Sequence, residues 1–150
     1  LLPEGAINLY DLGSGAGFAG MVLAILRPGL NVTLIESDAK KCAFLSAVSR
    51  ETGTPVTIVN KRIEAARALP APDLVTARAL ASLSELFGYV WAWAREKPEL
   101  RQIFPKGAQA QTEIKTAQAA GWTFEVALTS SKTEAEAQIL TVTKLGKNWG

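Results

Sequence analysis

The chain has 150 residues, of which 48% are hydrophobic and 20% charged, and its formal net charge is +2 at pH 7. This composition is typical of one globular domain with a substantial core. One cysteine and no histidine exclude a disulfide framework, a Cys/His zinc site and a Ser-His-Asp triad. No apolar run approaches the roughly 20 residues that span a bilayer, so we expect no membrane partner, no metal and a cytoplasmic location.

Strand and helix patterns alternate over the first half of the chain. The expected elements are a strand over residues 7–12, a helix over 18–26, a strand over 31–36, a long helix capped by Ser37 or Asp38 and ending at Gly53, and strands over 55–59 and 73–77. Pro28-Gly29 end the first helix. The long helix carries Cys42, Leu45, Val48 and Thr52 at helical spacing, which predicts that this stripe packs on the core.

The second half begins with an amphipathic helix whose apolar face comprises Leu83, Leu86, Phe87, Val90 and Ala94. Residues 100–104 predict a fifth strand, although Arg101 and Gln102 make it polar for a central one. A helix over 109–120 ends at Gly121. Residues 123–129 and 137–144 predict an antiparallel pair of closing strands.

This order predicts a doubly wound, Rossmann-like α/β fold, with a mostly parallel seven-stranded sheet and an antiparallel C-terminal strand. Ligands of such sheets bind beyond the carboxyl ends of the strands. The prediction therefore places residues 13–18, Glu36, residues 60–64 and residues 76–78 along one rim.

The turn after the first strand reads Asp11-Leu-Gly-Ser-Gly-Ala-Gly-Phe18. Its glycines (Gly13, Gly15 and Gly17) permit close backbone approach, and the following helix presents free N–H groups. Residues 15–20 also fit G-x-G-x-x-G, and Glu36 follows at about the sequence separation expected of a ribose-binding acid. A nicotinamide or flavin dinucleotide is therefore one candidate. Asp11 would repel a pyrophosphate and could hold the cationic methionine part of S-adenosylmethionine, directly or through water. The residues favour S-adenosylmethionine and leave open a dinucleotide or a turn without ligand.

Six segments occur in order along the chain: DLGSGAGFAG, LIESDAKKCAFL, NKRIE, DLVTARALASL, FPKG and SSKTEAEAQIL. Together they resemble the bacterial small-subunit ribosomal RNA guanine-N7 methyltransferases, the RsmG (GidB) family, from about Leu9 to Val142. The resemblance implies a class I methyltransferase fold. It also implies methyl transfer from S-adenosylmethionine to N7 of a guanine in the 530 loop of 16S rRNA, on naked RNA or on the small ribosomal subunit.

The resemblance also implies roles for single residues. Gly13 and Phe18 would line the cofactor site, although Phe18 could equally enter the core. Ile63 and Glu64 would lie beside the adenine, although Glu64 could instead cap a short helix. Arg78 would sit at the mouth of the methyl-donor pocket.

Basic residues on the predicted rim suggest contacts with RNA. Arginine can contact a phosphate or guanine O6, so Arg78 is a candidate for RNA as well as for cofactor. Lys106 and Lys132 could contact RNA phosphates, and Lys40-Lys41 with Lys61-Arg62 could extend a basic face. Guanine N7 already carries a lone pair, so no proton need leave it. Catalysis could therefore rest on positioning, by Arg78 and Lys106, without a histidine base.

The chain departs from the family pattern in three places. Ala19 stands where proline is usual, the fifth strand is more polar, and the helical segment that usually precedes the first strand is missing. We therefore expect residues 1–150 to form a single methyltransferase domain without that segment, and to be a monomer. A nicotinamide-dependent oxidoreductase, a non-catalytic RNA- or ribosome-binding domain and a small-molecule methyltransferase are the alternatives.

Overall fold

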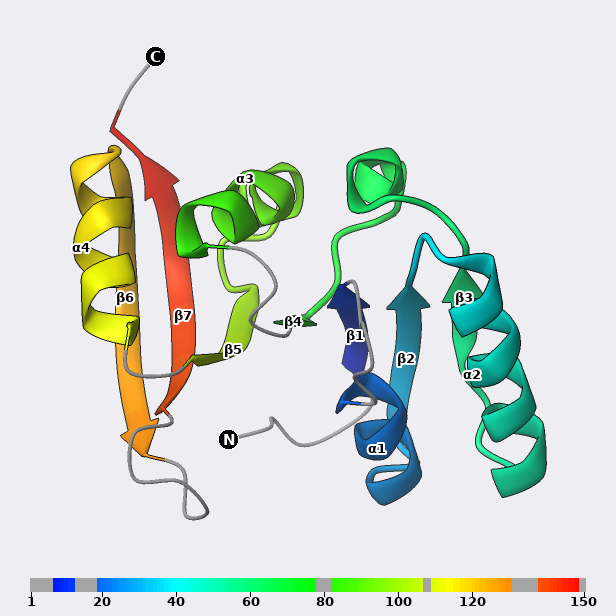
Figure 1. The fold of residues 1–150 in the computed structure, drawn as a ribbon. Coiled ribbons are helices and arrows are strands. Elements are labelled where there is room, and N and C mark those ends of the chain that lie inside the picture. The colour runs from blue at the N-terminus through cyan, green and yellow to red at the C-terminus, as the bar shows by residue number, and fades with distance from the viewer. Residues whose placement is uncertain (1–6, 13–18, 78–81, 107–108, 131–137, 149–150) are drawn as a thin grey trace.

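The computed structural model describes residues 7–12, 19–77, 82–106, 109–130 and 138–148. Figure 1 shows one sheet with helices packed beside it. The strands are β1 (Ile7–Leu12), β2 (Leu30–Ile35), β3 (Thr57–Val59), β4 (Leu74–Ala77), β5 (Arg101–Lys106), β6 (Trp122–Ser130) and β7 (Gln138–Lys147). The helices are α1 (Ala19–Leu26), α2 (Ala39–Thr52), α3 (Leu83–Ala94), α4 (Ala110–Ala119) and the short 3₁₀ helix η1 (Ile63–Ala68).

The sheet has seven strands in the order β3-β2-β1-β4-β5-β7-β6. β1 pairs in parallel with β2 and β4, and the parallel pairing continues to β3 on one side and to β5 on the other. β7 is antiparallel to both of its neighbours, β5 and β6. The predicted doubly wound α/β fold with an antiparallel C-terminal strand is therefore confirmed.

Two hydrophobic clusters cover the two faces of the sheet. Successive residues of β1 alternate between them, because neighbouring side chains of a strand point to opposite faces. Leu9 belongs to the cluster with Met21 of α1 and Leu45 of α2. Tyr10 belongs to the cluster with Phe87 of α3, which also includes residues of η1 and α4. Figure 1 shows α1 and α2 beside the β1–β2–β3 half of the sheet and α4 beside β6.

The ends of α2 follow from its flanking residues. The Asp38 carboxylate accepts the backbone N–H groups of Lys40 and Lys41, at 2.8 and 3.2 Å, so Asp38 is the cap. Gly53 ends the helix with φ of 64°, a left-handed conformation that glycine adopts without strain. Both predicted boundaries are confirmed.

The predicted core stripe of α2 is only partly correct. Cys42 and Leu45 are buried and Val48 is half-buried, but Thr52 is exposed. The Thr52 hydroxyl donates to the Val48 carbonyl at 2.7 Å. Its polar group is therefore satisfied on the helix surface, and the prediction that Thr52 packs on the core is wrong.

The apolar face of α3 is buried as predicted. Its buried residues are Leu83, Leu86, Phe87, Val90, Trp93 and Ala94. β5 lies inside the sheet despite its polar residues. It pairs with β4 on one edge and with β7 on the other, so β7 lies between β5 and β6.

Among the described residues, no helix is long and apolar enough to cross a bilayer.

Candidate active site

The carboxyl ends of β1, β2, β3 and β4 lie at one level. Leu12 is in register with Ile35 and with Ala77, and Ile35 is in register with Val59. Residues directly after these strands therefore meet along one rim. The predicted rim is confirmed for Glu36, for residues 60–64 and for the end of β4. Other predicted site residues lie outside the described residues, namely Gly13, Gly15, Gly17, Phe18, Arg78 and Lys132.

Lys106, another predicted site residue, is the last residue of β5. Its backbone pairs with Gln138 of β7. The structure therefore places Lys106 at the carboxyl end of the next strand along from β4, on the rim where the sequence analysis expected it.

Asp11 is the first charged residue of this rim, and it is only 1% exposed. Its Oδ1 accepts a hydrogen bond from the Thr76 hydroxyl at 2.7 Å, and its Oδ2 accepts the backbone N–H of Gly20 at 3.2 Å. Gly20 lies in the first turn of α1, where the helix dipole favours negative charge. The carboxylate therefore joins β1, β4 and α1 at a point where a negative charge is stabilised.

Glu36 is the second carboxylate of the rim, and it is 5% exposed. Its backbone N–H donates to the Val59 carbonyl at 3.0 Å. Its side-chain Oε2 accepts the backbone N–H of Asp38 at 2.8 Å. Glu36 thus follows β2 directly. Its backbone is hydrogen-bonded to β3, and its carboxylate is hydrogen-bonded to the residue that caps α2.

Two side chains hold the backbone carbonyl of Glu36. The Cys42 thiol donates to it at 3.3 Å. With its amide oriented so that the nitrogen faces both carbonyls, Asn60 donates to it at 3.2 Å and to the Ser37 carbonyl at 3.0 Å. Burial raises the pKa of the Cys42 thiol, and the nearby charges of Glu36 and Asp38 raise it further. The thiol therefore remains protonated near neutral pH and keeps its role as a donor.

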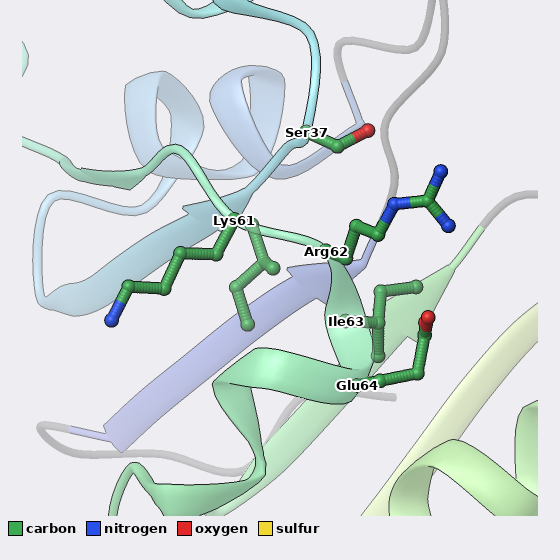
Figure 2. Close-up of a pocket in the computed structure, with 6 residues that line it drawn as sticks. Ser37, Lys61, Arg62, Ile63 and Glu64 are labelled. Carbon is green, nitrogen blue, oxygen red and sulfur yellow. The ribbon is translucent and has the colours of Figure 1, made fainter.

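A cavity of about 250 Å³ opens beside Glu36, after the ends of β2 and β3. Its lining residues are Ile35, Ser37, Lys61, Arg62, Ile63 and Glu64. Figure 2 shows the side chains of Ser37, Arg62, Ile63 and Glu64 pointing to the same side, whereas Lys61 extends the opposite way. The cavity is close to the lower end of the size range of small-molecule sites. It brings the predicted residues Ile63 and Glu64 together with the end of β2.

Ile63 and Glu64 begin η1. Ile63 is half-buried and packs against the core cluster that contains Tyr10. One side of the cavity is therefore apolar and rests on the hydrophobic core. Glu64 lies in the first turn of η1 and is exposed. A carboxylate there complements the helix N-terminus and is also available to a ligand.

Four basic side chains flank this cavity and the start of α2. Lys40, Lys41, Lys61 and Arg62 are all exposed. Lys40 and Lys41 lie in the first turn of α2, after β2, and Lys61 and Arg62 lie between β3 and η1. These positive charges stand at the β2–β3 end of the rim, together with the exposed carboxylates of Asp38 and Glu64.

Three residues build the site that were predicted only as part of the rim or of the glycine motif, without individual roles: Gly20, Asn60 and Thr76. The signal for Thr76 is its place in β4, directly in register with Asp11. The signal for Asn60 is its position directly after β3, which matches the position of Glu36 directly after β2.

Within the described residues, no cluster of histidine, cysteine and carboxylate side chains could hold a metal ion.

Solved structures similar to this chain share its fold. A mutant of the 16S rRNA (adenine(1408)-N(1))-methyltransferase from Catenulisporales acidiphilia superposes with a TM-score of 0.70, at 16% identity, over 97% of this chain and 88% of that chain. Aeropyrum pernix fibrillarin, solved with natively bound S-adenosyl-L-methionine, superposes with a TM-score of 0.69, at 15% identity, over 95% and 69%. The sheet order and the rim thus define a Rossmann-like methyltransferase fold.

The sequence is similar to one family throughout. The family model of rRNA small subunit methyltransferase G (GidB) matches residues 1–140. An enzyme of that name from Methylorubrum extorquens is 45% identical over 151 residues, which cover 98% of this chain and 70% of the relative. That from Parvibaculum lavamentivorans is 44% identical over 95% of this chain, which spans 63% of the relative. The chain belongs to the rRNA small subunit methyltransferase G family.

This membership confirms the resemblance carried by the six sequence segments. It also places the chain in a family of ribosomal RNA methyltransferases, so the oxidoreductase alternative is not favoured. The roles of the individual site residues remain predictions.

Proposed function

We propose that this chain transfers a methyl group from S-adenosylmethionine to small-subunit ribosomal RNA, at N7 of a guanine in the 530 loop of 16S rRNA. Besides family membership, one structural observation supports this proposal. Two buried carboxylates, Asp11 and Glu36, stand at the carboxyl ends of adjacent parallel strands, and the cavity beside Glu36 is lined by Ile63 and Glu64.

These residues fit the chemistry of S-adenosylmethionine. The methionine end of this cofactor is cationic, and a buried Asp11 offers it a negative charge, directly or through water. Ribose hydroxyls are hydrogen-bond donors, and Glu36 is an acceptor at the distance expected of a ribose-binding acid. Ile63 offers an apolar surface to the adenine, and Glu64 offers an acceptor. Gly13, Gly15, Gly17 and Phe18 would complete the binding site.

When bound, S-adenosylmethionine supplies an electrophilic methyl group. The neutral guanine base carries a lone pair at N7, so the protein does not need to remove a proton. A chain with no histidine can therefore act by holding the base in line, which is worth several orders of magnitude in rate. We propose this positioning role for Arg78 and Lys106, which follow β4 and end β5.

The RNA would be held mainly through its phosphates. Arg78, Lys106 and Lys132 are the proposed RNA-binding residues. The exposed side chains of Lys40, Lys41 and Arg62 would extend the same face, whereas Lys61 points away from Arg62. Contacts of this kind are electrostatic and independent of base sequence. They would set the orientation of the RNA, while the shape of the site selects the guanine.

A dinucleotide fits the same rim less well. Its pyrophosphate would need free N–H groups at the start of α1. The Asp11 carboxylate already accepts the Gly20 N–H in that turn, and its charge would repel a phosphate. This disfavours NAD on physical grounds that are independent of family membership.

The first test is a thermal-shift and calorimetric titration with S-adenosylhomocysteine and, separately, with NAD. A ligand that binds only the folded state raises stability with the logarithm of its concentration. We expect a saturable shift with S-adenosylhomocysteine and none with NAD. Glu36→Gln keeps an acceptor for the Asp38 N–H but loses the charge, and it should weaken binding about tenfold or more, equivalent to about 1.4 kcal/mol.

Glu51→Gln is the matched control, because Glu51 is exposed on α2 away from the cavity. It should bind S-adenosylhomocysteine like the wild type. A shift with NAD alone would contradict the proposal. A clean unfolding transition with no shift from either ligand would instead support a non-catalytic RNA- or ribosome-binding domain.

A further inference from the structure

We propose that Thr76 is a positioning residue of the cofactor site, which orients the Asp11 carboxylate toward the methionine end of S-adenosylmethionine. The inference rests on the proposed function and deepens it. Thr76 is not expected to touch the reacting atoms. Its role is carried by its hydrogen bond to Asp11.

The geometry of the pair is set by the sheet. Thr76 of β4 is in register with Asp11 of β1 across the parallel ladder. The two side chains lie on the same face of adjacent strands, and both residues are buried, at 6% and 1% exposed. The Thr76 hydroxyl donates to Oδ1 at 2.7 Å, while the Gly20 N–H donates to Oδ2 at 3.2 Å. These two bonds reach both carboxylate oxygens and so constrain the position and the rotation of the carboxylate.

The two donors differ from a charged partner in one respect. A buried carboxylate needs hydrogen bonds to remain in place at low cost. The Thr76 hydroxyl and the Gly20 N–H are neutral groups, so these two bonds position the carboxylate without adding a positive charge beside it.

The surroundings of Thr76 make its hydroxyl hard to replace. Thr76 also lines a cavity of about 390 Å³ whose walls include the apolar side chains of Val22, Leu23 and Ile103. Without the hydroxyl, Oδ1 of Asp11 would lose this hydrogen bond. We expect the carboxylate to shift from its ligand-binding orientation, because the loss of a hydrogen bond at a buried acceptor is unfavourable.

The position of Thr76 in the rim separates its effect from that of Glu36. Thr76 acts at β1, β4 and α1, whereas Glu36, Ile63 and the cavity lie after β2 and β3. Removing the Thr76 hydroxyl should therefore weaken ligands that carry the methionine end. Ligands that consist only of the adenosine end should bind as before.

Two ligands test this directly by calorimetry on the full chain. S-adenosylhomocysteine carries the amino-acid end, and 5′-methylthioadenosine has the same adenosine and thioether sulfur without it. Thr76→Val keeps the shape of the side chain and removes the hydroxyl. Thr76→Ser keeps the hydroxyl. We expect Thr76→Val to weaken S-adenosylhomocysteine about tenfold and to leave 5′-methylthioadenosine within about twofold of the wild type. Thr76→Ser should bind both ligands like the wild type.

A purely structural role gives a different pattern. If Thr76→Val weakens both ligands equally, or neither, or if Thr76→Ser fails to rescue, the inference is wrong. Thr76→Ala replaces Thr76→Val should the latter not fold. If neither folds while Thr76→Ser does, the hydroxyl serves stability alone and the inference is likewise wrong. Failure of the wild type to bind either ligand would contradict the proposed function itself.

Discussion

Gly20 and Asp11 lie so close together that Gly20 has no room for a side chain. A Cβ atom on Gly20 would come within 2.7 Å of the Asp11 Cβ and within 2.9 Å of its Oδ2. The same Cβ atom would come within 2.7 Å of Leu34 Cδ2. The close packing of α1 on β1 and β2 therefore depends on glycine at this position, and the same contact delivers the Gly20 N–H to the carboxylate.

Gly20→Ala should destabilise the fold and weaken cofactor binding. The added methyl group must push α1 away from Asp11, and overpacking of this kind costs about 1–3 kcal/mol. We expect a loss of about 2 kcal/mol in the free energy of unfolding, measured by urea denaturation. Gly88→Ala is the matched control, because a Cβ on Gly88 in α3 meets nothing within 4 Å. That variant should gain about 0.5–1 kcal/mol, as alanine does in a helix interior. Equal effects at both positions would contradict this packing account.

Gln102→Met should stabilise the protein. Gln102 is fully buried on β5, between Val75 and Val142 in register. Within the described residues, neither its Oε1 nor its Nε2 has a hydrogen-bond partner. Removing an unsatisfied buried amide should raise the free energy of unfolding by about 1–2 kcal/mol. Gln102→Glu has nearly the same shape and should be destabilising at pH 7. A lower midpoint in urea for Gln102→Met than for wild type would show that the amide is satisfied.

Asp73 should make stability depend on acid pH. The backbone N–H of Asn8 and the ammonium of Lys97 hold the pKa of the Asp73 carboxyl below its usual value. A lowered folded-state pKa stabilises the protein above the ordinary pKa of about 4, and this contribution is lost as the pH falls through the folded value. We expect Asp73→Asn to lose about 1 kcal/mol near pH 6. In parallel urea titrations the difference from wild type should close below about pH 4, and a difference that does not change with pH would refute the mechanism.

Cys42 should react slowly with thiol reagents in the native protein. Burial raises its pKa, and Glu36 and Asp38 raise it further, so little thiolate is present near neutral pH. The chain has one cysteine, so a mass increase reports this thiol alone. Alkylation by iodoacetamide at pH 7.5 should be at least about 100-fold slower in the native chain than in urea. Similar rates in both conditions would mean that the thiol is accessible.

The features that were predicted from the sequence depend on local signals. The bounds of β1, the Asp38 cap and the Gly53 end of α2 each follow from a few neighbouring residues. The rim followed from one further rule, that parallel strands end at the same edge. Family-specific segments then fixed the expected chemistry.

The features that could not be predicted depend on contacts between distant parts of the chain. The bond between Asp11 and Thr76 requires the register of two strands that lie 65 residues apart. The burial of Gln102 follows from β7 inserting beside β5, which no local pattern in residues 100–104 reveals. Thr52 has the spacing of a core residue, yet its hydroxyl bonds to its own helix.

Methyl transfer to ribosomal RNA tests the central claim most directly. Small ribosomal subunits and naked 16S rRNA would be incubated with the chain and methyl-labelled S-adenosylmethionine, and the RNA digested and analysed by mass spectrometry. The account predicts one labelled nucleoside, 7-methylguanosine, from the 530 loop, and much less of it with Glu36→Gln than with Glu51→Gln. Label at another base or position, or none from a chain that binds S-adenosylhomocysteine, would contradict it.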